Sequence, residues 1–123
     1  MRESGILMPV ASVPGPFGIG TLGKGAYDFV DFLVRAGQHV WQILPLSPTG
    51  FGDSPYQSCS AFAGNPYFID FEPLCRRGLL KKQEYAGISF GRAPCAVDYD
   101  AVRETHFAVL RRAFARFSKW YPD

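Results

Sequence analysis

The sequence has no apolar run long enough to cross a membrane, and its first residues do not form a signal peptide. The opening apolar run, at residues 6–10, is short and contains Pro9. Cysteine is also scarce. The chain has three, Cys59, Cys75 and Cys95, and no two of them form a CxxC pair. They predict reduced thiols rather than a disulfide framework or a zinc site. We therefore expect a cytoplasmic protein.

The chain lacks an excess of charge of one sign: 13 basic and 11 acidic residues give a net charge of +2. This balance argues against nucleic acid or an anionic membrane as the main partner. Four basic residues gather late in the sequence, namely Arg111, Arg112, Arg116 and Lys119. We interpret them as a solvated helix face, although a nucleic-acid patch is the alternative. The metal motif HExxH and the nucleophile motif GxSxG are absent as well. His39 and His106 stand alone, and we expect both to be structural.

The first 45 residues have the pattern of a strand, a helix and a second strand. Residues 6–8 with Val10 form a continuous apolar run of the kind that is buried on both faces of a parallel sheet. Residues 24–36 have helical periodicity, with Tyr27, Val30, Leu33 and Val34 on one stripe. Residues 39–44 are again rich in apolar and β-branched side chains. This order predicts a βαβ unit with parallel strands and a right-handed crossover, hence an α/β fold.

The later sequence predicts a short strand at residues 68–70, a helical turn at 72–78 and a loop at 87–94. A second long helix is expected to begin near Asp98 or Asp100 and to end near Lys119. Its predicted apolar stripe consists of Phe107, Leu110, Ala113, Phe114 and Phe117. Two parallel strands and these helices cannot close a sheet or cover both its faces. We therefore expect residues 1–123 to be an incomplete domain.

A glycine-rich run between the first strand and the first helix matches the dinucleotide pattern GxGxxG in form. Its glycines are Gly18, Gly20 and Gly23. However, Pro14 and Pro16 separate them from the strand, and residues 38–46 hold no acid for a ribose hydroxyl. We interpret the run as a shaped loop that leads into a helix.

The segment after the second strand, residues 47–67, has the composition of a ligand-binding loop. It leaves the carboxyl end of a parallel strand, where α/β folds place their ligands. Aromatic rings such as Phe51 and Tyr56 are interleaved with polar groups such as Asp53 and Ser54. Rings and directed hydrogen bonds suit a pyranose. Composition alone leaves two interpretations open, a sugar-binding loop and a structural loop whose aromatic residues serve the core.

Three motifs in order resemble one family. The run GFGDSPYQ at residues 50–57, continued by SAFAGNPY at 60–67, resembles the N-terminal region of 4-α-glucanotransferases of the amylomaltase family. SVPGPFGIG at 12–20 and WQILPL at 41–46 are similar to the same family. The sequence departs from the family at Val10-Ala11, where members often have His-Pro, and at Cys59, where Phe is common.

The resemblance implies the N-terminal portion of a (β/α)₈ TIM barrel, with the remainder of the catalytic domain absent from residues 1–123. It implies transfer of α-1,4-glucan segments between maltooligosaccharides, with retention, through a covalent glycosyl-enzyme intermediate. It implies no cofactor and no metal, and catalytic carboxylates on later strands. An α-amylase-type hydrolase and a non-catalytic glycan-binding module are the alternatives.

Substrate-binding roles are implied for four residues of the loop. Tyr56 matches the aromatic residue that stacks on the donor glucose next to the cleaved bond. Ser54 and Asp53 match the polar residues just before it, and the resemblance implies that Ser54 contacts the sugar and that Asp53 shapes the loop. Phe51 stands where many members have Tyr, at a secondary glucan site, and it lacks the hydroxyl that could donate a hydrogen bond there.

Overall fold

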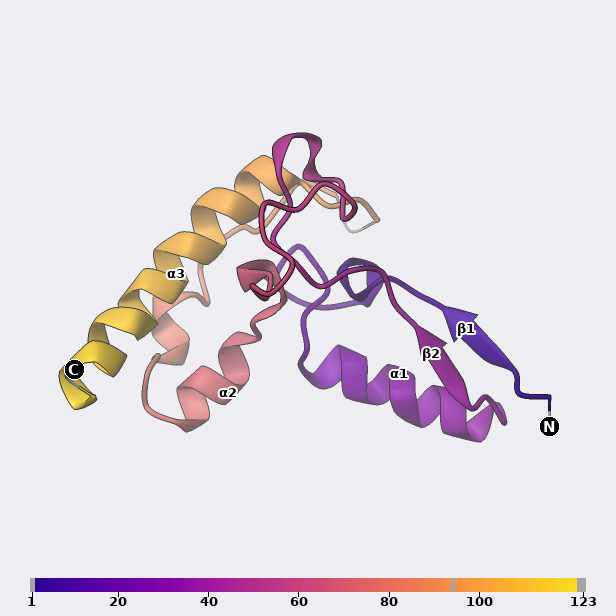
Figure 1. The fold of residues 1–123 in the computed structure, drawn as a ribbon. Helices are drawn as coiled ribbons and strands as arrows, with labels where there is room; N and C mark the ends of the chain where they lie inside the picture. Colours follow the sequence, from indigo (N-terminus) through magenta and orange to yellow (C-terminus); the bar gives the residue numbers. More distant parts are fainter. Residues whose placement is uncertain (1, 94, 122–123) are drawn as a thin grey trace.

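The computed structural model describes residues 2–93 and 95–121. Its strands and α-helices are β1 (Gly5–Leu7), α1 (Lys24–Arg35), β2 (Val40–Gln42), α2 (Phe71–Arg76) and α3 (Tyr99–Trp120). Short 3₁₀ turns lie between them: η1 (Val10–Ser12), η2 (Phe51–Asp53), η3 (Pro66–Phe68) and η4 (Lys82–Glu84). Figure 1 shows two groups of elements, with β1, β2 and α1 at one end and α2 and α3 at the other.

The predicted βαβ unit is confirmed. β1 and β2 pair in parallel, with Gly5 opposite Val40 and Leu7 opposite Gln42. α1 connects them and ends before Gly37, whose φ of 65° suits glycine and closes the helix. Both strands are shorter than the sequence predicts. Because the strands are parallel, the chain leaves both of them at the same edge of the sheet, where their carboxyl ends lie, and this edge positions the site.

The predicted burial of the βαβ unit is wrong for the chain as the structure describes it. Leu7 in β1 and Val40 in β2 are about half exposed, and of the predicted stripe on α1 only Leu33 is buried, whereas Val34 is 70% exposed. The cause is that the described sheet has two strands, so much of its surface and of α1 has no neighbour to cover it. Trp41 is an exception, because it packs against Phe29 of α1 with ring centroids 5.0 Å apart.

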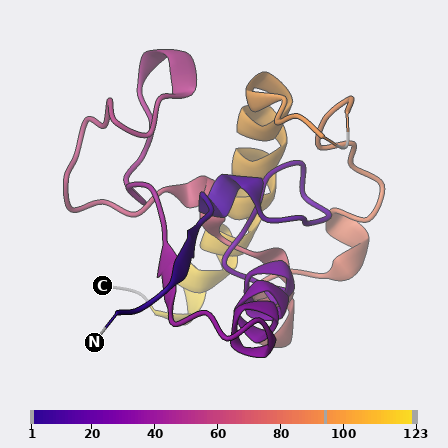
Figure 2. The ribbon, with the colours of Figure 1, turned by 90° about the vertical axis from the view of Figure 1, so that its right-hand side faces the viewer.

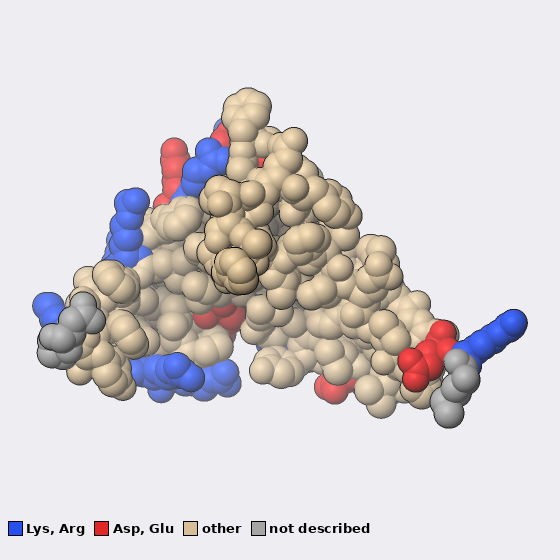
Figure 3. Space-filling view, viewed as in Figure 1, with Lys and Arg blue, Asp and Glu red and all other residues tan. Residues whose placement is uncertain are grey.

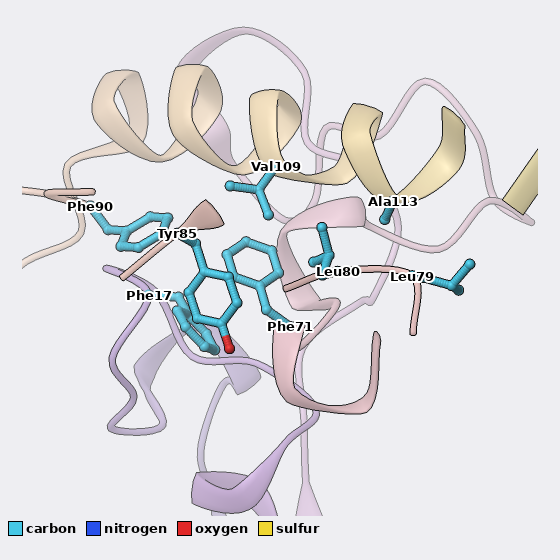
Figure 4. Packing of buried hydrophobic residues seen from close by; sticks show 8 residues of the cluster. All are labelled: Phe17, Phe71, Leu79, Leu80, Tyr85, Phe90, Val109 and Ala113. Atoms are coloured by element: carbon cyan, nitrogen blue, oxygen red, sulfur yellow. The ribbon is translucent and has the colours of Figure 1, made fainter. Parts of the chain in front are cut away.

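The main hydrophobic core lies in the other group of elements, between α3, α2 and the segments around them (Figure 4). Phe71, the first residue of α2, is fully buried, and its ring centroid lies 4.6 Å from that of Phe17. The other members of this core are Leu79, Leu80, Tyr85, Phe90, Val109 and Ala113. Phe17 comes from the loop after β1, so this core holds that loop against α3.

α3 forms where it is predicted, but its buried stripe overlaps the predicted one only in part. The side chain of Asp98 accepts a hydrogen bond from the amide of Ala101 and caps the helix. The buried positions are Val102, His106, Val109 and Ala113. Their spacing of four, three and four residues places them on one side of a helix. Of the predicted stripe, Ala113 is buried and Phe107 and Leu110 are half-buried, whereas Phe114 is 68% exposed. The prediction is therefore confirmed at Ala113 and wrong at Phe114.

Residues 68–70 are not a strand, contrary to the prediction. Pro66–Phe68 forms a 3₁₀ turn, and Asp70 caps α2 by accepting a hydrogen bond from the amide of Glu72 at 2.9 Å. Asp70 also accepts a hydrogen bond from the buried Thr21 hydroxyl at 2.6 Å. Asp70, which the sequence predicts to end a strand, therefore caps the start of α2. The helical turn predicted at 72–78 is confirmed by α2.

Candidate functional site

The loop of residues 49–65 begins beyond the carboxyl end of β2 and protrudes from the body of the molecule (Figure 2). Its tip is closed by an antiparallel bridge between Thr49 and Ser58, and the amide of Gly50 donates to the carbonyl oxygen of Gln57 at 2.9 Å. At its far end, the amide of Asn65 donates to the carbonyl oxygen of Leu46 at 2.7 Å. The loop is therefore fixed at both ends beside the sheet edge.

A cavity of about 200 Å³ lies where the segments that follow β1 and β2 meet. Val10 and Ser12 line it from the first segment, and Leu46 lines it from the second. Asp53 of the loop and Tyr99 of α3 complete its wall. The position agrees with the expectation that ligands bind beyond the carboxyl ends of parallel strands.

The four residues with predicted substrate-binding roles, Phe51, Asp53, Ser54 and Tyr56, all lie in one turn of this loop. Phe51 is fully exposed and Tyr56 is 73% exposed, so both rings are available for stacking. Asp53 and Ser54 are half-buried between them. The hydroxyl oxygen of Ser54 accepts a hydrogen bond from the amide of Tyr56 at 3.4 Å. Sugar binding by these residues stays a prediction, since their arrangement alone does not test it.

Asp53 is the carboxylate that lines this cavity in the described chain, and both its oxygens have partners. Oδ1 accepts a hydrogen bond from the Thr49 hydroxyl at 3.2 Å, and Oδ2 lies 3.5 Å from Nη2 of Arg103. The pKa of Arg103 is raised, first by the neighbouring Tyr67 hydroxyl and then by the charge of Asp53. Burial raises the pKa of Tyr99, and the charge of Asp53 raises it further.

Arg103 and Tyr99 are site residues that the sequence did not predict. Both lie on the first turns of α3, some 50 positions after the loop that they adjoin. The acid at Asp53 needs a cation near it when it is partly buried, which is the one signal that could have prompted a search. Nothing in local spacing selects Arg103 from the other basic residues.

The glycine-rich run is used for packing, which argues against a phosphate-binding role. A Cβ atom on Gly18 would collide with the carbonyl oxygen of Phe90, and one on Gly20 with the carbonyl oxygen of Val10. A Cβ atom on Gly23 would meet the carboxylate of Asp70. The Gly20 amide already donates to the carbonyl oxygen of Ala11 at 3.0 Å. A cavity of about 640 Å³ adjoins this run, but the glycines serve the contacts between loops.

Other classes of site find no support in residues 2–93 and 95–121. No group of three or more His, Cys, Asp or Glu side chains in this part of the chain is arranged to hold a metal ion. The three cysteines are free. No helix among the described residues combines the length and the apolar character that crossing a membrane would require.

Comparisons with known proteins give one consistent result. The family model described as 4-alpha-glucanotransferase matches residues 8–122. A 4-alpha-glucanotransferase of Streptococcus pneumoniae serotype 4 is 52% identical over 116 residues, which is 94% of this chain and 23% of that protein. The 4-alpha-glucanotransferase of Thermus thermophilus is 48% identical over 118 residues, which is 96% of this chain and 23% of that protein.

A solved structure has the same fold over this region. The amylomaltase from Streptococcus agalactiae in complex with acarbose superposes with a TM-score of 0.94 at 53% sequence identity. The match covers 97% of this chain and 24% of that one. The chain thus spans about a quarter of the length of the relatives that it matches.

Proposed function

The chain belongs to the 4-alpha-glucanotransferase family, and from this premise we propose that it is the N-terminal part of a (β/α)₈ barrel that transfers α-1,4-glucan segments between maltooligosaccharides. The observation that carries the proposal is the structural match to an amylomaltase over nearly the whole chain. The names of the relatives favour a transferase over an α-amylase-type hydrolase or a glycan-binding module.

In this proposal the loop of residues 49–65 binds the glucan. Tyr56 stacks on the donor glucose, because its ring is largely exposed and the residue before it, Pro55, lines the cavity at the sheet edge. Ser54 lies next to it and can hydrogen-bond a sugar hydroxyl. Phe51 offers a second, fully exposed ring at the tip of the same loop. The ligand of the solved relative, acarbose, supports a saccharide as the class of ligand.

The proposed transfer needs carboxylates that residues 2–93 and 95–121 do not supply at the cavity. A retaining mechanism uses two carboxyl groups about 5–5.5 Å apart, one as nucleophile and one as acid and base. In the described chain, Asp53 is the one carboxylate that lines the cavity, and Arg103 and Thr49 occupy its oxygens. We therefore expect residues 1–123 to bind the donor and to leave the chemistry to groups on later strands of the barrel.

The uncovered surface of the βαβ unit suits the packing of such later strands. Leu7, Val40 and Ile43 are exposed on or next to the two strands, and Tyr27 and Val34 are about 70% exposed on α1. On the face that Figure 3 shows, this end of the molecule carries little charge except at its tip and at one acidic group on its lower margin. Each strand also has one unpaired edge. These features support the proposal that further strands of a barrel continue the sheet. The free thiols agree with the cytoplasm as the place of action.

A chimera tests the function. Residues 1–123 replace the matching quarter of the Streptococcus agalactiae amylomaltase, and the products formed from maltotriose are separated by chain length. Oligosaccharides longer than maltotriose are expected. Glucose and maltose alone would indicate a hydrolase and contradict the proposal. As a control, the 123-residue chain by itself is expected to give no product, and transfer by this chain would show that the catalytic carboxylates lie within it.

A further inference from the structure

Asp53 has a left-handed backbone conformation, which is unusual for a residue other than glycine. Its φ is +52°, and it is the one non-glycine residue with positive φ in the described chain. Gly52 before it also has positive φ, 78°. Two consecutive left-handed residues make the sharp turn η2, and this conformation is unfavourable for any residue with a Cβ atom, although Asp tolerates it better than most. Such a turn persists when surrounding contacts hold it.

The contacts that hold Asp53 come from two directions. Thr49 precedes it in the loop and donates a hydrogen bond to Oδ1 at 3.2 Å. Arg103 reaches from α3 to within 3.5 Å of Oδ2. The Asp53 side chain is 16% exposed, so its charge is shielded from water, whereas Arg103 is 52% exposed. Arg103 also lies 3.7 Å from the fully solvated Asp100, on its own helix.

The turn at Asp53 determines where Tyr56 lies. The amide of Gln57 donates to the carbonyl oxygen of Ser54 at 3.1 Å, and Gly50 and Gln57 are also hydrogen-bonded, which makes residues 50–57 a small closed unit. A rotation of Asp53 therefore moves this unit as a whole, together with the Tyr56 ring. Because α3 is packed into the main core through Val109, it provides a rigid reference for the loop.

We propose that Arg103 is a positioning residue for glucan binding, which acts through Asp53 to fix the orientation of Tyr56 relative to α3. This inference rests on the proposed function, in which Tyr56 stacks on the donor sugar. Arg103 itself touches no sugar. Its guanidinium keeps the Asp53 carboxylate, and with it the left-handed turn, in one orientation, so that the ring is presented to the sugar without a search among loop conformations.

The test uses the chimera described above with maltotriose as substrate. We expect Arg103→Ala to raise KM about tenfold with a smaller change in kcat, a modest effect because the ion pair is partly exposed. Asp53→Asn is expected to behave alike, and Arg103→Lys, which keeps the charge, to recover most of the loss. Arg111→Ala is the matched control, because Arg111 is an exposed arginine about two turns further along the same helix.

A double-variant comparison separates positioning from general loss of structure. In a Tyr56→Ala background, Arg103→Ala is expected to have no further effect on kcat/KM, because the ring that it positions is gone. If the two substitutions act independently, or if Arg103→Ala leaves KM unchanged while Tyr56→Ala raises it, the inference is wrong and the proposed function stands. A chimera that makes no longer oligosaccharides would instead contradict the proposed function.

A second measurement on the 123-residue chain does not depend on catalysis. Chymotrypsin cleaves after exposed aromatic residues, and Tyr56 is one. We expect Arg103→Ala to raise the rate of cleavage after Tyr56 several-fold relative to the unsubstituted chain, because the loop samples more conformations. Arg111→Ala is expected to leave it unchanged. Equal cleavage rates in all three chains would overturn the positioning role, whatever the chimera shows.

Discussion

Nε2 of His106 lies 2.9 Å from the carbonyl oxygen of Phe17, so a fully buried imidazole on α3 donates a hydrogen bond to the loop that follows β1. Nδ1 of the same ring is buried and has no partner among the residues that the structure describes. The ring is therefore neutral, with its proton on Nε2, and is surrounded by the rings of Phe17, Phe71 and Phe90. It packs against the core that holds the loop after β1 against α3.

Because His106 is buried, we expect the protein to lose stability in weak acid. Burial lowers the pKa of His106 below its usual 6.5, against smaller opposing effects of the Phe17 carbonyl and the charge of Asp70. Below about pH 6.5 the unfolded chain takes up a proton that the folded chain resists. The free energy of unfolding should therefore fall with pH, by up to about 1.4 kcal/mol per pH unit. Urea unfolding between pH 7.5 and 5 measures this slope.

His106→Leu is expected to flatten that slope, even if it changes the stability at pH 7.5. His39→Asn provides the control, since His39 is exposed and precedes β2. The same slope in His106→Leu as in the unsubstituted chain would show that another group is responsible.

A second, separate change is expected at lower pH. Hydrogen bonds from Arg116, and next from the amide of Lys81, lower the pKa of Glu84 from 4.5 to about 2. The stability that this carboxylate contributes is complete above pH 4.5 and is lost as pH falls toward 2. In Glu84→Gln the change in unfolding free energy over this range should be smaller, as measured by urea unfolding. Glu104→Gln, at an exposed position of α3, should keep the full change.

Gly20 is predicted to be the least replaceable glycine of the loop after β1. A methyl group there would collide with the carbonyl oxygen of Val10 and come within 3 Å of the backbone of Val13. Because backbone cannot move aside cheaply, Gly20→Ala should lower the free energy of unfolding by about 3 kcal/mol. Gly64→Ala is the control, as its methyl group would meet no atom within 4 Å. Thermal unfolding of both variants compares them, and similar midpoints would contradict the prediction.

Tyr56→Ala tests the proposed donor contact. In the chimera it should reduce kcat/KM for maltotriose by about 100-fold, because in the proposed function this ring orients the sugar next to the cleaved bond. Its stability should hardly change, since the side chain is 73% exposed. Phe62→Ala removes another ring of the same loop, one that is fully exposed, and should have little effect. Kinetics that are unchanged by Tyr56→Ala would remove this residue from the donor site.

Local patterns predicted the elements of the fold well. The long helices begin and end within about a residue of the prediction, because Gly37 and Asp98 act within their own turns. Burial was harder to predict. On α3 the aromatic side chain of Phe114 suggested the core, but His106 fills it, since burial depends on which face meets a neighbour and not on hydrophobicity alone.

The candidate site also has a part that local sequence predicts and a part that depends on tertiary packing. The loop and its position at the sheet edge followed from the order of elements, and the four proposed sugar contacts are neighbours along the chain. The partner of Asp53 could not be predicted, because Arg103 is brought to it by tertiary packing across 50 residues. A sequence with several arginines on one helix does not reveal which of them faces the loop.

The unpaired edges of β1 and β2 bear on how the chain behaves during production. Each exposes a row of backbone donors and acceptors beside apolar side chains, a surface on which a strand of another molecule can add. The isolated chain should therefore associate with itself as its concentration rises, so its unfolding is best measured in dilute solution. Co-expression with the rest of the proposed barrel, which would cover these edges, would be the practical route to concentrated material for crystallisation.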